Sequence, residues 1–298
     1  MRETDTLHRF MLEQAGVRGE WVHLDASWQA LLARHDYPPV VRDLLGQAYA
    51  AVALVAATLK FDGSLILQVT GSGPVHMIVV QADGRGRLRG LARFRETPPE
   101  DAGLLDCTGH DARLMLTLDP GDGGERYQGV VELEGASLAE ALDVYFERSE
   151  QLPTRVWLAT DGESAAGMLL QGVPGDDGRS VTRDSEDWNR ATILAETVTA
   201  DELLALDAGT LLGRLFHEER VRLFEGSAVS FHCPCSRERV AETLRGLGRD
   251  EVRSIIAEQG AVEVTCEFCN AHYHFDAVDA ERVCAPDASQ PPTPDTRQ

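Results

Sequence analysis

The sequence predicts an α+β fold, in which antiparallel sheets pack against helices that lie apart from them along the chain. Short runs of β-branched and aliphatic residues alternate with turns such as Gly71-Ser72-Gly73-Pro74 and Asp83-Gly84, which is the pattern of successive hairpins. The segment from Val40 to Lys60 instead repeats its apolar residues at helical spacing. Because the hairpins and the helices are segregated, an antiparallel layered fold is favoured over a parallel doubly wound sheet.

Residues 1–173 form the predicted N-terminal α+β domain. Two strands precede a helix at 27–35 and the long helix, and a turn follows at 61–63. The capping box Ser137-Leu138-Ala139-Glu140 opens a further helix that extends to about Gln151. The core-facing residues of the long helix are expected to be Leu44, Leu45, Ala48, Val52, Val55 and Leu59. The expected strands are 8–12, 19–24, 64–70, 75–81, 86–94, 114–118, 127–133, 155–159 and 168–172.

A change of composition marks residues 174–228, which are predicted to form a helical linker. Short amphipathic helices are expected at 191–198, 200–206 and 211–218. The segment carries many leucines among abundant acids, so it can dock on a neighbouring surface but has little core of its own. Without that support it should lie near the low end of local stability. Its leucines are Leu194, Leu203, Leu204, Leu206, Leu211, Leu212 and Leu215.

The charge of the chain limits the partners that it can bind. The formal net charge is −21 over 298 residues, and Lys60 is the only lysine. Binding to phosphates needs clustered basic residues, which argues against nucleic acid and anionic membranes as main partners. The residues after Met1 are polar, and the longest apolar stretch, from Ala48 to Leu59, is too short to span a bilayer. The protein is therefore expected in the cytoplasm, where thiols are kept reduced.

Four of the six cysteines form two close pairs in a small segment, residues 229–284. Cys233 and Cys235 are separated by one residue, and Cys266 and Cys269 by two. This spacing suits a tetrahedral zinc site with four cysteine ligands, and it also suits two local disulfides. A Cys₃His site that recruits His232, His272 or His274 is an alternative. A unit of this size needs a staple such as a metal, whereas the proline-rich tail, 285–298, is expected to be disordered.

The remaining motifs do not indicate catalysis. Cys107 follows two leucines and is expected to be a buried small residue, whereas Cys284 borders the tail and could be an exposed free thiol. The glycine-rich turns lack the Gly-Lys-Ser/Thr of a phosphate loop, and the histidines have no visible nucleophile partner. The chain is therefore not expected to be an enzyme. A zinc-ribbon nucleic-acid-binding protein and a thiol–disulfide oxidoreductase that uses Cys266 and Cys269 are the competing functions. A purely structural zinc site is the simplest alternative.

The cysteine motifs with their flanks resemble those of the redox-regulated 33-kilodalton heat-shock chaperone family. The likeness covers nearly the whole chain, although Cys284 is not part of the family pattern. It rests on segments in both the cysteine-bearing and the N-terminal parts. These segments are Cys233-Pro234-Cys235-Ser236-Arg237-Glu238-Arg239, Val264-Thr265-Cys266-Glu267-Phe268-Cys269, Arg18-Gly19-Glu20, Leu59-Lys60-Phe61-Asp62-Gly63, Gln128-Gly129-Val130-Val131, Ser149-Glu150-Gln151-Leu152-Pro153-Thr154, Leu169-Leu170-Gln171 and Leu215-Phe216-His217-Glu218-Glu219.

The resemblance implies a redox-regulated, ATP-independent holdase that binds unfolding proteins under oxidative stress. In the reduced state its four cysteines would bind one Zn²⁺ per chain as thiolates. Oxidants would release the zinc and form the disulfides Cys233–Cys235 and Cys266–Cys269. The linker would then unfold, client-binding surface would appear, and the active form would be a homodimer.

Overall fold

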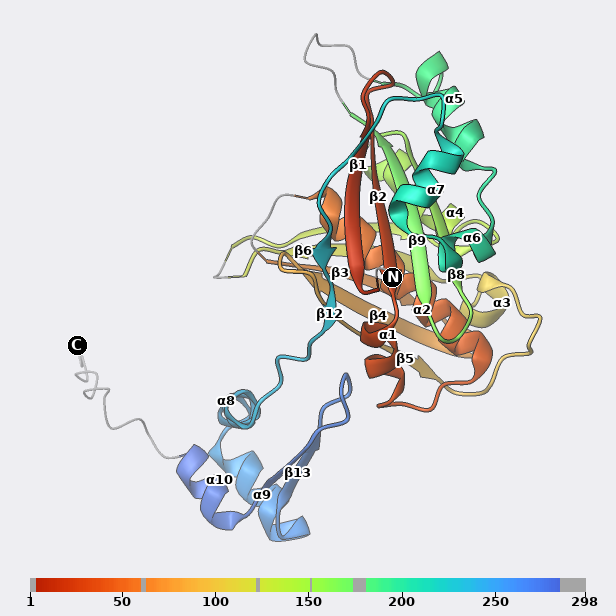
Figure 1. The fold of residues 1–298 in the computed structure, drawn as a ribbon. Helices are drawn as coiled ribbons and strands as arrows, with labels where there is room; N and C mark the ends of the chain where they lie inside the picture. Colours follow the sequence, from red (N-terminus) through yellow and green to blue (C-terminus); the bar gives the residue numbers. More distant parts are fainter. Residues whose placement is uncertain (1–3, 60–62, 122–123, 151, 174–180, 285–298) are drawn as a thin grey trace, which may run out of the picture. The chain divides into compact units, whose positions relative to one another are not determined.

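The computed structural model describes residues 4–59, 63–121, 124–150, 152–173 and 181–284. The predicted turn at 61 and 62, the predicted helix ends at Lys60 and Gln151, the start of the linker at 174–180 and the tail lie outside the described residues. Two compact units, Met1–His232 and Cys233–Gln298, divide the chain (Figure 1). The mixed α+β architecture with antiparallel sheets confirms the fold class predicted from the sequence.

The first unit contains two six-stranded sheets. The first sheet has the order β10-β1-β2-β9-β8, with β11 also paired to β1, and all its pairs are antiparallel. The second has the order β12-β5-β4-β3-β6-β7, antiparallel except for the parallel pair of β12 with β5. The strands of the first sheet are β1 (Thr6–Leu12), β2 (Val17–Leu24), β8 (Thr154–Thr160), β9 (Ala165–Gly172), β10 (Val221–Leu223) and β11 (Ser227–Ala228). Those of the second are β3 (Ser64–Thr70), β4 (Val75–Asp83), β5 (Arg87–Phe94), β6 (Arg113–Asp119), β7 (Tyr127–Glu132) and β12 (Ser230–Phe231).

The long helix α2 (Pro39–Thr58) contacts strands of both sheets and forms the centre of the main core. Five of its six predicted core positions are buried, but Leu59 follows the end of the helix and is 36% exposed. By length and composition α2 is long and apolar enough to cross a membrane, so the argument from a short apolar stretch was wrong. Two thirds of its most apolar window, 67%, is buried within the protein, which is what a core helix shows.

The described residues of the N-terminal part also form three shorter helices and one π-helical turn. Ser137 begins α4, where its hydroxyl accepts a hydrogen bond from the Glu140 backbone N–H at 3.2 Å. The Glu140 carboxylate accepts from the backbone N–H of Ala136 at 2.8 Å, so only half of the predicted capping box forms. The helices are α1 (Ala26–Leu32), α3 (Leu104–Thr108) and α4 (Leu138–Tyr145), and α4 continues into the π-helical turn η1 (Phe146–Glu150).

Within residues 181–228 three helices cover one face of the first sheet (Figure 1). They are α5 (Glu186–Ala195), α6 (Ala200–Ala205) and α7 (Ala208–Leu215). The first and the last begin earlier than predicted because Ser185 and Asp207 act as N-caps, their side chains accepting from the backbone N–H groups of Trp188 and Thr210. This segment belongs to the first compact unit.

The second unit is a small α+β assembly. It contains α8 (Arg237–Leu247), α9 (Arg249–Gln259), the hairpin β13 (Val262–Thr265) and β14 (His272–Phe275), and α10 (Ala277–Val283), which the sequence pattern did not reveal. Its core consists of seven buried residues, Ala241, Leu244, Val252, Val262, Phe275, Ala280 and Val283. So small a core gives little stability by hydrophobic burial alone.

Candidate metal centre

The four cysteines of the two predicted pairs come together in the second unit. Their sulfur atoms all lie within 4.8 Å of one another, and each residue is half-buried. Two of the separations run between the pairs, at 3.2 Å from the Cys235 sulfur to the Cys269 sulfur and 3.6 Å from the Cys233 sulfur to the Cys266 sulfur. All four are free thiols, because a disulfide would bring two sulfur atoms to about 2.05 Å.

A tight turn between β13 and β14 presents the second pair. The backbone N–H of Asn270 donates to the carbonyl of Cys266 at 2.7 Å, and the Cys266 N–H donates to the carbonyl of Ala271 at 2.9 Å. Asn270 has a φ of 57°, in the left-handed region that asparagine tolerates better than most residues. The turn folds the chain back within five residues, so Cys266 and Cys269 face the same space.

The first pair lies in the loop that leads into α8. Pro234 separates Cys233 from Cys235, and Ser236 follows as the N-cap of the helix. The Ser236 hydroxyl accepts from the backbone N–H of Arg239 at 3.3 Å, which fixes the place where the loop ends. Cys235 therefore stands directly before a capped helix, and its position is set by the start of that helix.

The thiols of the cluster differ in acidity. Burial raises the pKa of Cys233, and burial together with the hydrogen bond to Cys235 raises that of Cys269 well above its usual range. Burial opposes ionisation of Cys235 as well, but hydrogen bonds from the Tyr273 hydroxyl, at 3.2 Å, and from Cys269 lower its pKa to about 7. Cys235 is the favoured thiolate when no metal is bound, and thiolates are the form that oxidants attack.

The residues fit a tetrahedral zinc ion. Ligand sulfurs at about 2.3 Å from zinc lie about 3.8 Å apart in a tetrahedron. The separations of 3.2 and 3.6 Å and the 4.8 Å limit bracket that value. Tyr273, which donates to a cluster sulfur, is the kind of outer partner that orients metal ligands. The cluster could thus hold a metal ion, with four sulfur donors.

The other candidate residues lie apart from this donor set. No histidine joins the cluster among the described residues. His272 and His274 are exposed, and His272 Nδ1 pairs with the Thr265 hydroxyl at 2.9 Å. Arg237 follows the first cysteine pair by two residues, and its guanidinium is bound to Asp279 at 2.6 Å and lies over the Phe275 ring.

The two remaining cysteines are not in the cluster. Cys107 is fully buried in the main core, as expected, and burial raises the pKa of its thiol. Cys284 is half-buried at the end of α10 and packs against the small core rather than standing free on the surface.

A second feature is the apolar face that the linker helices cover. On the sheet side it includes Phe10, Trp21, Met168 and Leu170, each at most 1% exposed, and on the helix side the predicted leucines Leu203, Leu204, Leu211, Leu212 and Leu215. Sequence reasoning found the leucines but not the surface that receives them. Strand β9 indicates this second covered surface, because all eight of its residues are buried. A strand is buried along its whole length only when both of its faces are covered.

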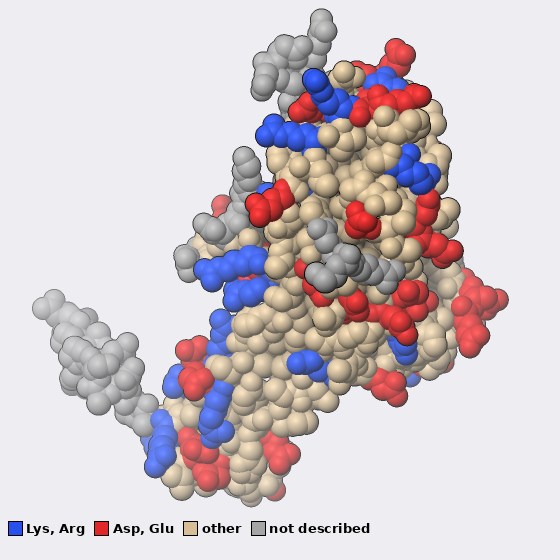
Figure 2. Space-filling model, in the orientation of Figure 1, with Lys and Arg blue, Asp and Glu red and all other residues tan. Residues whose placement is uncertain are grey.

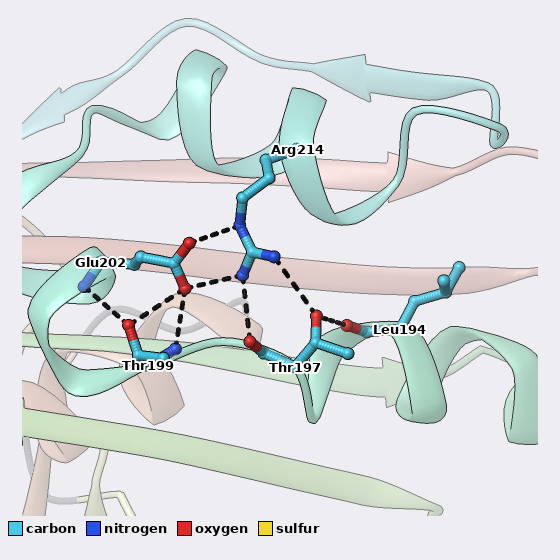
Figure 3. A network of polar contacts seen from close by, with 5 residues as sticks. All are labelled: Leu194, Thr197, Thr199, Glu202 and Arg214. Atoms are coloured by element: carbon cyan, nitrogen blue, oxygen red, sulfur yellow. Dashed lines mark hydrogen bonds and ion pairs between the residues drawn. The ribbon is translucent and has the colours of Figure 1, made fainter.

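Polar contacts tie the linker helices to one another and to the sheet. Arg214 on α7 bonds Glu202 on α6 and the carbonyl of Thr197 before it (Figure 3). The His23 ring donates a hydrogen bond from Nε2 to the Leu204 carbonyl at 3.0 Å, because a carbonyl oxygen can only accept. The linker is thus fixed by a buried apolar layer with a few directed polar contacts.

Together the fold and the cluster define a two-unit α+β protein in which the small unit gathers four thiols able to hold a metal ion. The Hsp33 protein family profile matches residues 5–276. A 33 kDa chaperonin of Nitrosococcus oceani is 52% identical over 293 residues, which cover 98% of this chain and 99% of that protein. One of Pseudomonas aeruginosa is 45% identical over 295 residues, with 98% and 99% covered.

The solved structures include a relative with the same fold. The crystal structure of the 33 kDa chaperonin, or heat shock protein 33 homolog, of Thermotoga maritima matches with a TM-score of 0.78 at 21% identity, over 94% of this chain and 97% of that one. The chain belongs to the Hsp33 family of chaperones, as its cysteine motifs suggested. A chaperone of this family is expected to bind unfolded proteins.

Proposed function

We propose that this protein is an ATP-independent holdase, inactive when reduced and zinc-bound, that oxidation activates to bind unfolding proteins. The observation that carries the proposal is the gathering of four cysteine sulfurs within 4.8 Å in a unit whose core has only seven buried residues. Such a unit depends on its metal for stability, so chemistry at the thiols decides whether it folds.

The energy scale supports that dependence. Structural zinc contributes about 10–16 kcal/mol of apparent binding free energy in small domains, whereas whole domains are stable by about 5–15 kcal/mol. Zinc bound here would keep the four cysteines as thiolates. Its ligands in the proposal are Cys233, Cys235, Cys266 and Cys269, one ion per chain.

Oxidation removes the ligand set. Two thiolates give two electrons to one molecule of hydrogen peroxide, a sulfur–sulfur bond forms, and the peroxide leaves as two hydroxide ions. Two such steps consume all four thiolates and yield the proposed disulfides Cys233–Cys235 and Cys266–Cys269. These bonds close short loops, so they restore little of the lost stability.

Loss of the small unit's fold is proposed to free the linker. The linker helices cover an apolar sheet face. Exposed apolar patches of this kind bind unfolded chains without sequence preference. The acids of the linker would keep the opened protein in solution, and the active form is proposed to be a cytoplasmic homodimer.

Neither competing function gains support from the second unit. Three of its arginines are already held in ion pairs, Arg237 with Asp279, and Arg249 and Arg253 with Glu281. Acidic and basic side chains are interspersed over the drawn face of this unit (Figure 2), a poor surface for phosphates. A thioredoxin-like βαβ unit, which a thiol–disulfide oxidoreductase would be expected to have, does not surround Cys266 and Cys269, which lie in a hairpin turn. We therefore propose no enzymatic activity.

The test combines metal content, thiol count and aggregation assays. We expect one zinc per reduced chain, its loss with four thiols after peroxide at mildly raised temperature, and suppression of client aggregation only then. Cys266→Ser should lower the zinc content and disturb regulation, whereas Cys107→Ser and Cys284→Ser should leave zinc binding intact. If the reduced, zinc-loaded protein suppresses aggregation equally well, the redox switch is refuted.

Disulfide mapping tests the proposed pairing separately. In the reduced state the sulfurs of Cys235 and Cys269 lie 3.2 Å apart, although these residues belong to different pairs. Peptides cleaved between the two motifs should each carry an internal disulfide after oxidation. A peptide linked across the motifs would contradict the pairing while leaving the switch itself in place.

A further inference from the structure

The segment 221–232, here called the strap, joins the edges of the two sheets in the first unit. In Figure 1 it runs beside β1 and then reaches the second sheet at β12. Its first part pairs with β1 through β10 and β11, and its last part pairs with β5 through β12. The strap therefore occupies one edge of each sheet with its own backbone.

Backbone hydrogen bonds hold the strap at both edges. On the β1 side, the N–H of Phe224 donates to the Arg9 carbonyl at 2.9 Å. On the β5 side, the N–H groups of Ser230 and His232 donate to the carbonyls of Gly86 and Leu88 at 3.0 and 2.8 Å. These hydrogen bonds use only main-chain atoms of the strap, so they do not depend on the identity of its side chains.

Few side chains of the strap are buried. Val229 is 5% exposed and Phe231 is half-buried with the Arg34 guanidinium over its ring, but Leu223 and Phe224 are 40% and 41% exposed. The three strands in the strap contain three, two and two residues. A segment with so little buried apolar area belongs to the low end of local stability.

A groove of about 950 Å³ lies beneath the strap. Its apolar lining comes from four elements and from the strap itself, and it includes Leu7 on β1, Ala53 and Ala56 on α2, Ala82 on β4, Leu88 on β5 and Phe224 of the strap. Charged side chains of both signs also border it, Arg9 and Arg85 together with Asp83 and Glu225. The two sheet edges thus flank an apolar channel.

The strap ends at the cysteine cluster. His232, whose N–H makes the last bond to β5, is joined by its peptide bond to Cys233. A change of backbone conformation at Cys233 therefore acts directly on that last bond.

We propose that the strap occupies a client-binding site in the inactive protein. In the activated protein, an extended segment of an unfolded polypeptide takes its place along the freed edges of β1 and β5. This inference rests on the proposed holdase function, and it adds a second surface and a mode of binding to the apolar sheet face that the linker helices cover. An extended chain replaces the strap's main-chain bonds and places apolar side chains in the groove, which is β-strand addition. Main-chain pairing needs no particular sequence, as a general chaperone requires.

Competition by peptides tests this mode. The probe is a peptide of residues 221–232, offered to the full-length oxidised protein against reduced, carboxymethylated α-lactalbumin, an unfolded client without thiols. The matched control has the same side chains but carries N-methyl groups at Phe224, Val229 and Ser230, which removes the donors to Arg9, Asp5 and Gly86. The unmodified peptide should displace client at a concentration about tenfold lower than the control, because several hydrogen bonds are lost together.

Photo-cross-linking gives a second readout. A benzophenone amino acid in place of Arg85, which is exposed at the groove, should capture the client only after oxidation. The same group in place of Val130, 46% exposed on the opposite edge strand β7, should show no such redox dependence. Client capture at both sites alike would overturn the proposal.

The possible outcomes distinguish failure of edge pairing from failure of the proposed holdase function. If oxidised protein holds the client but neither peptide competes, or both compete equally, edge pairing is overturned and the holdase stands. If a peptide of the linker helices, 200–215, competes instead, the client lies on the sheet face that those helices cover. If oxidised protein binds no client, both proposals fall.

Discussion

Arg214 and Glu202 connect two helices of the linker through a short ion pair, with 2.6 Å between Nε and Oε1. The same carboxylate accepts from the backbone N–H of Thr199 at 2.9 Å, which caps α6 (Figure 3). The hydrogen bond from Thr199 contributes most to holding the pKa of Glu202 below its usual value. Arg214 also donates to the carbonyl of Thr197 at 3.1 Å. One side chain from α7 thus stabilises the start of α6 and the end of the turn before it.

Replacing Arg214 with methionine should ease activation. Methionine retains much of the apolar stem of the side chain but cannot form the contacts to Glu202 and Thr197, so the docked linker loses stability relative to the open one. We expect activation by peroxide to become about two- to fivefold faster, the range expected when an exposed ion-pair network is lost. Stopped aliquots tested for suppression of client aggregation measure the rate.

Arg148→Met is the matched control. Arg148 forms a similar two-bond pair with Glu134, but both lie in the N-terminal part and outside the linker. Its loss should leave the activation rate unchanged. Equal acceleration in both variants would show that general stability, rather than the linker network, limits activation.

A cavity in the linker layer should switch on activity without oxidant. Leu211 is fully buried where α7 meets the first sheet, and Leu211→Ala should cost about 2–5 kcal/mol. Because the linker has little core of its own, we expect the loss to undock it locally. The reduced variant should suppress aggregation, and a protease should cut within 181–228 while the rest stays resistant.

Leu67→Ala places a comparable cavity in the main core, where Leu67 is also fully buried. That variant should lower the midpoint of global unfolding without constitutive chaperone activity. If Leu211→Ala remains inactive when reduced although its linker is cut, exposure of the covered face is insufficient for client binding.

Local pattern was sufficient to predict most elements of the first unit. The expected strands at 64–70 and 75–81 and the core stripe of α2 follow from side-chain periodicity, and the structure has β3, β4 and a buried helix there. The start of α5 was missed because it depends on the cap at Ser185, which lies in a polar stretch before the expected helix at 191–198. Propensity and period describe the interior of an element better than its ends.

Part of the candidate site, the two cysteine pairs, could be predicted from residue spacing rather than from the periodicity of side chains. Spacing of two and three residues within each cysteine pair restricts the sulfurs to a common side, so each pair was visible in sequence. The strap was not visible, because its strands of two or three residues carry no periodic signal and form only by pairing with β1 and β5. Likewise the hydrogen bond from Tyr273 to Cys235 depends on tertiary approach.

Removing the metal under reducing conditions should unfold the second unit and, as proposed above, free the linker, while the main core stays folded. A chelator strong enough to compete with four thiolates removes the main source of stability of a core with seven buried residues. Hydrogen exchange followed by mass spectrometry should show lost protection in 233–284, while α2 stays protected. Added zinc should restore the protection.

Cys107→Ser serves as the control for this experiment, since Cys107 lies in the main core and away from the cluster. It should respond to chelator and to zinc as the parent does. Retained protection in 233–284 after complete loss of metal would mean that the unit folds on its hydrophobic core alone.

Glu20 should make stability depend on pH in the direction opposite to that of most acids. Glu20 is 2% exposed on β2, and its Oε2 has no hydrogen-bond partner in the described structure. Burial raises its pKa from 4.5 to about 7, against the pull of Arg18 and Arg9. The folded protein therefore binds a proton that the unfolded chain releases between these values, so stability falls as pH rises from about 4.5 to 7.

Glu20→Gln removes that titration while preserving the shape of the side chain. At pH 8 the variant should be more stable than the parent by up to about 3 kcal/mol, since each unit of pKa shift corresponds to about 1.4 kcal/mol. Below pH 4.5 the two should be nearly equal. Urea unfolding from pH 4 to 8 measures the difference, with Glu163→Gln, exposed in the turn between β8 and β9, as control. A parallel pH dependence of parent and Glu20→Gln would show that Glu20 does not titrate in this range, and that the two arginines hold it ionised in the folded protein.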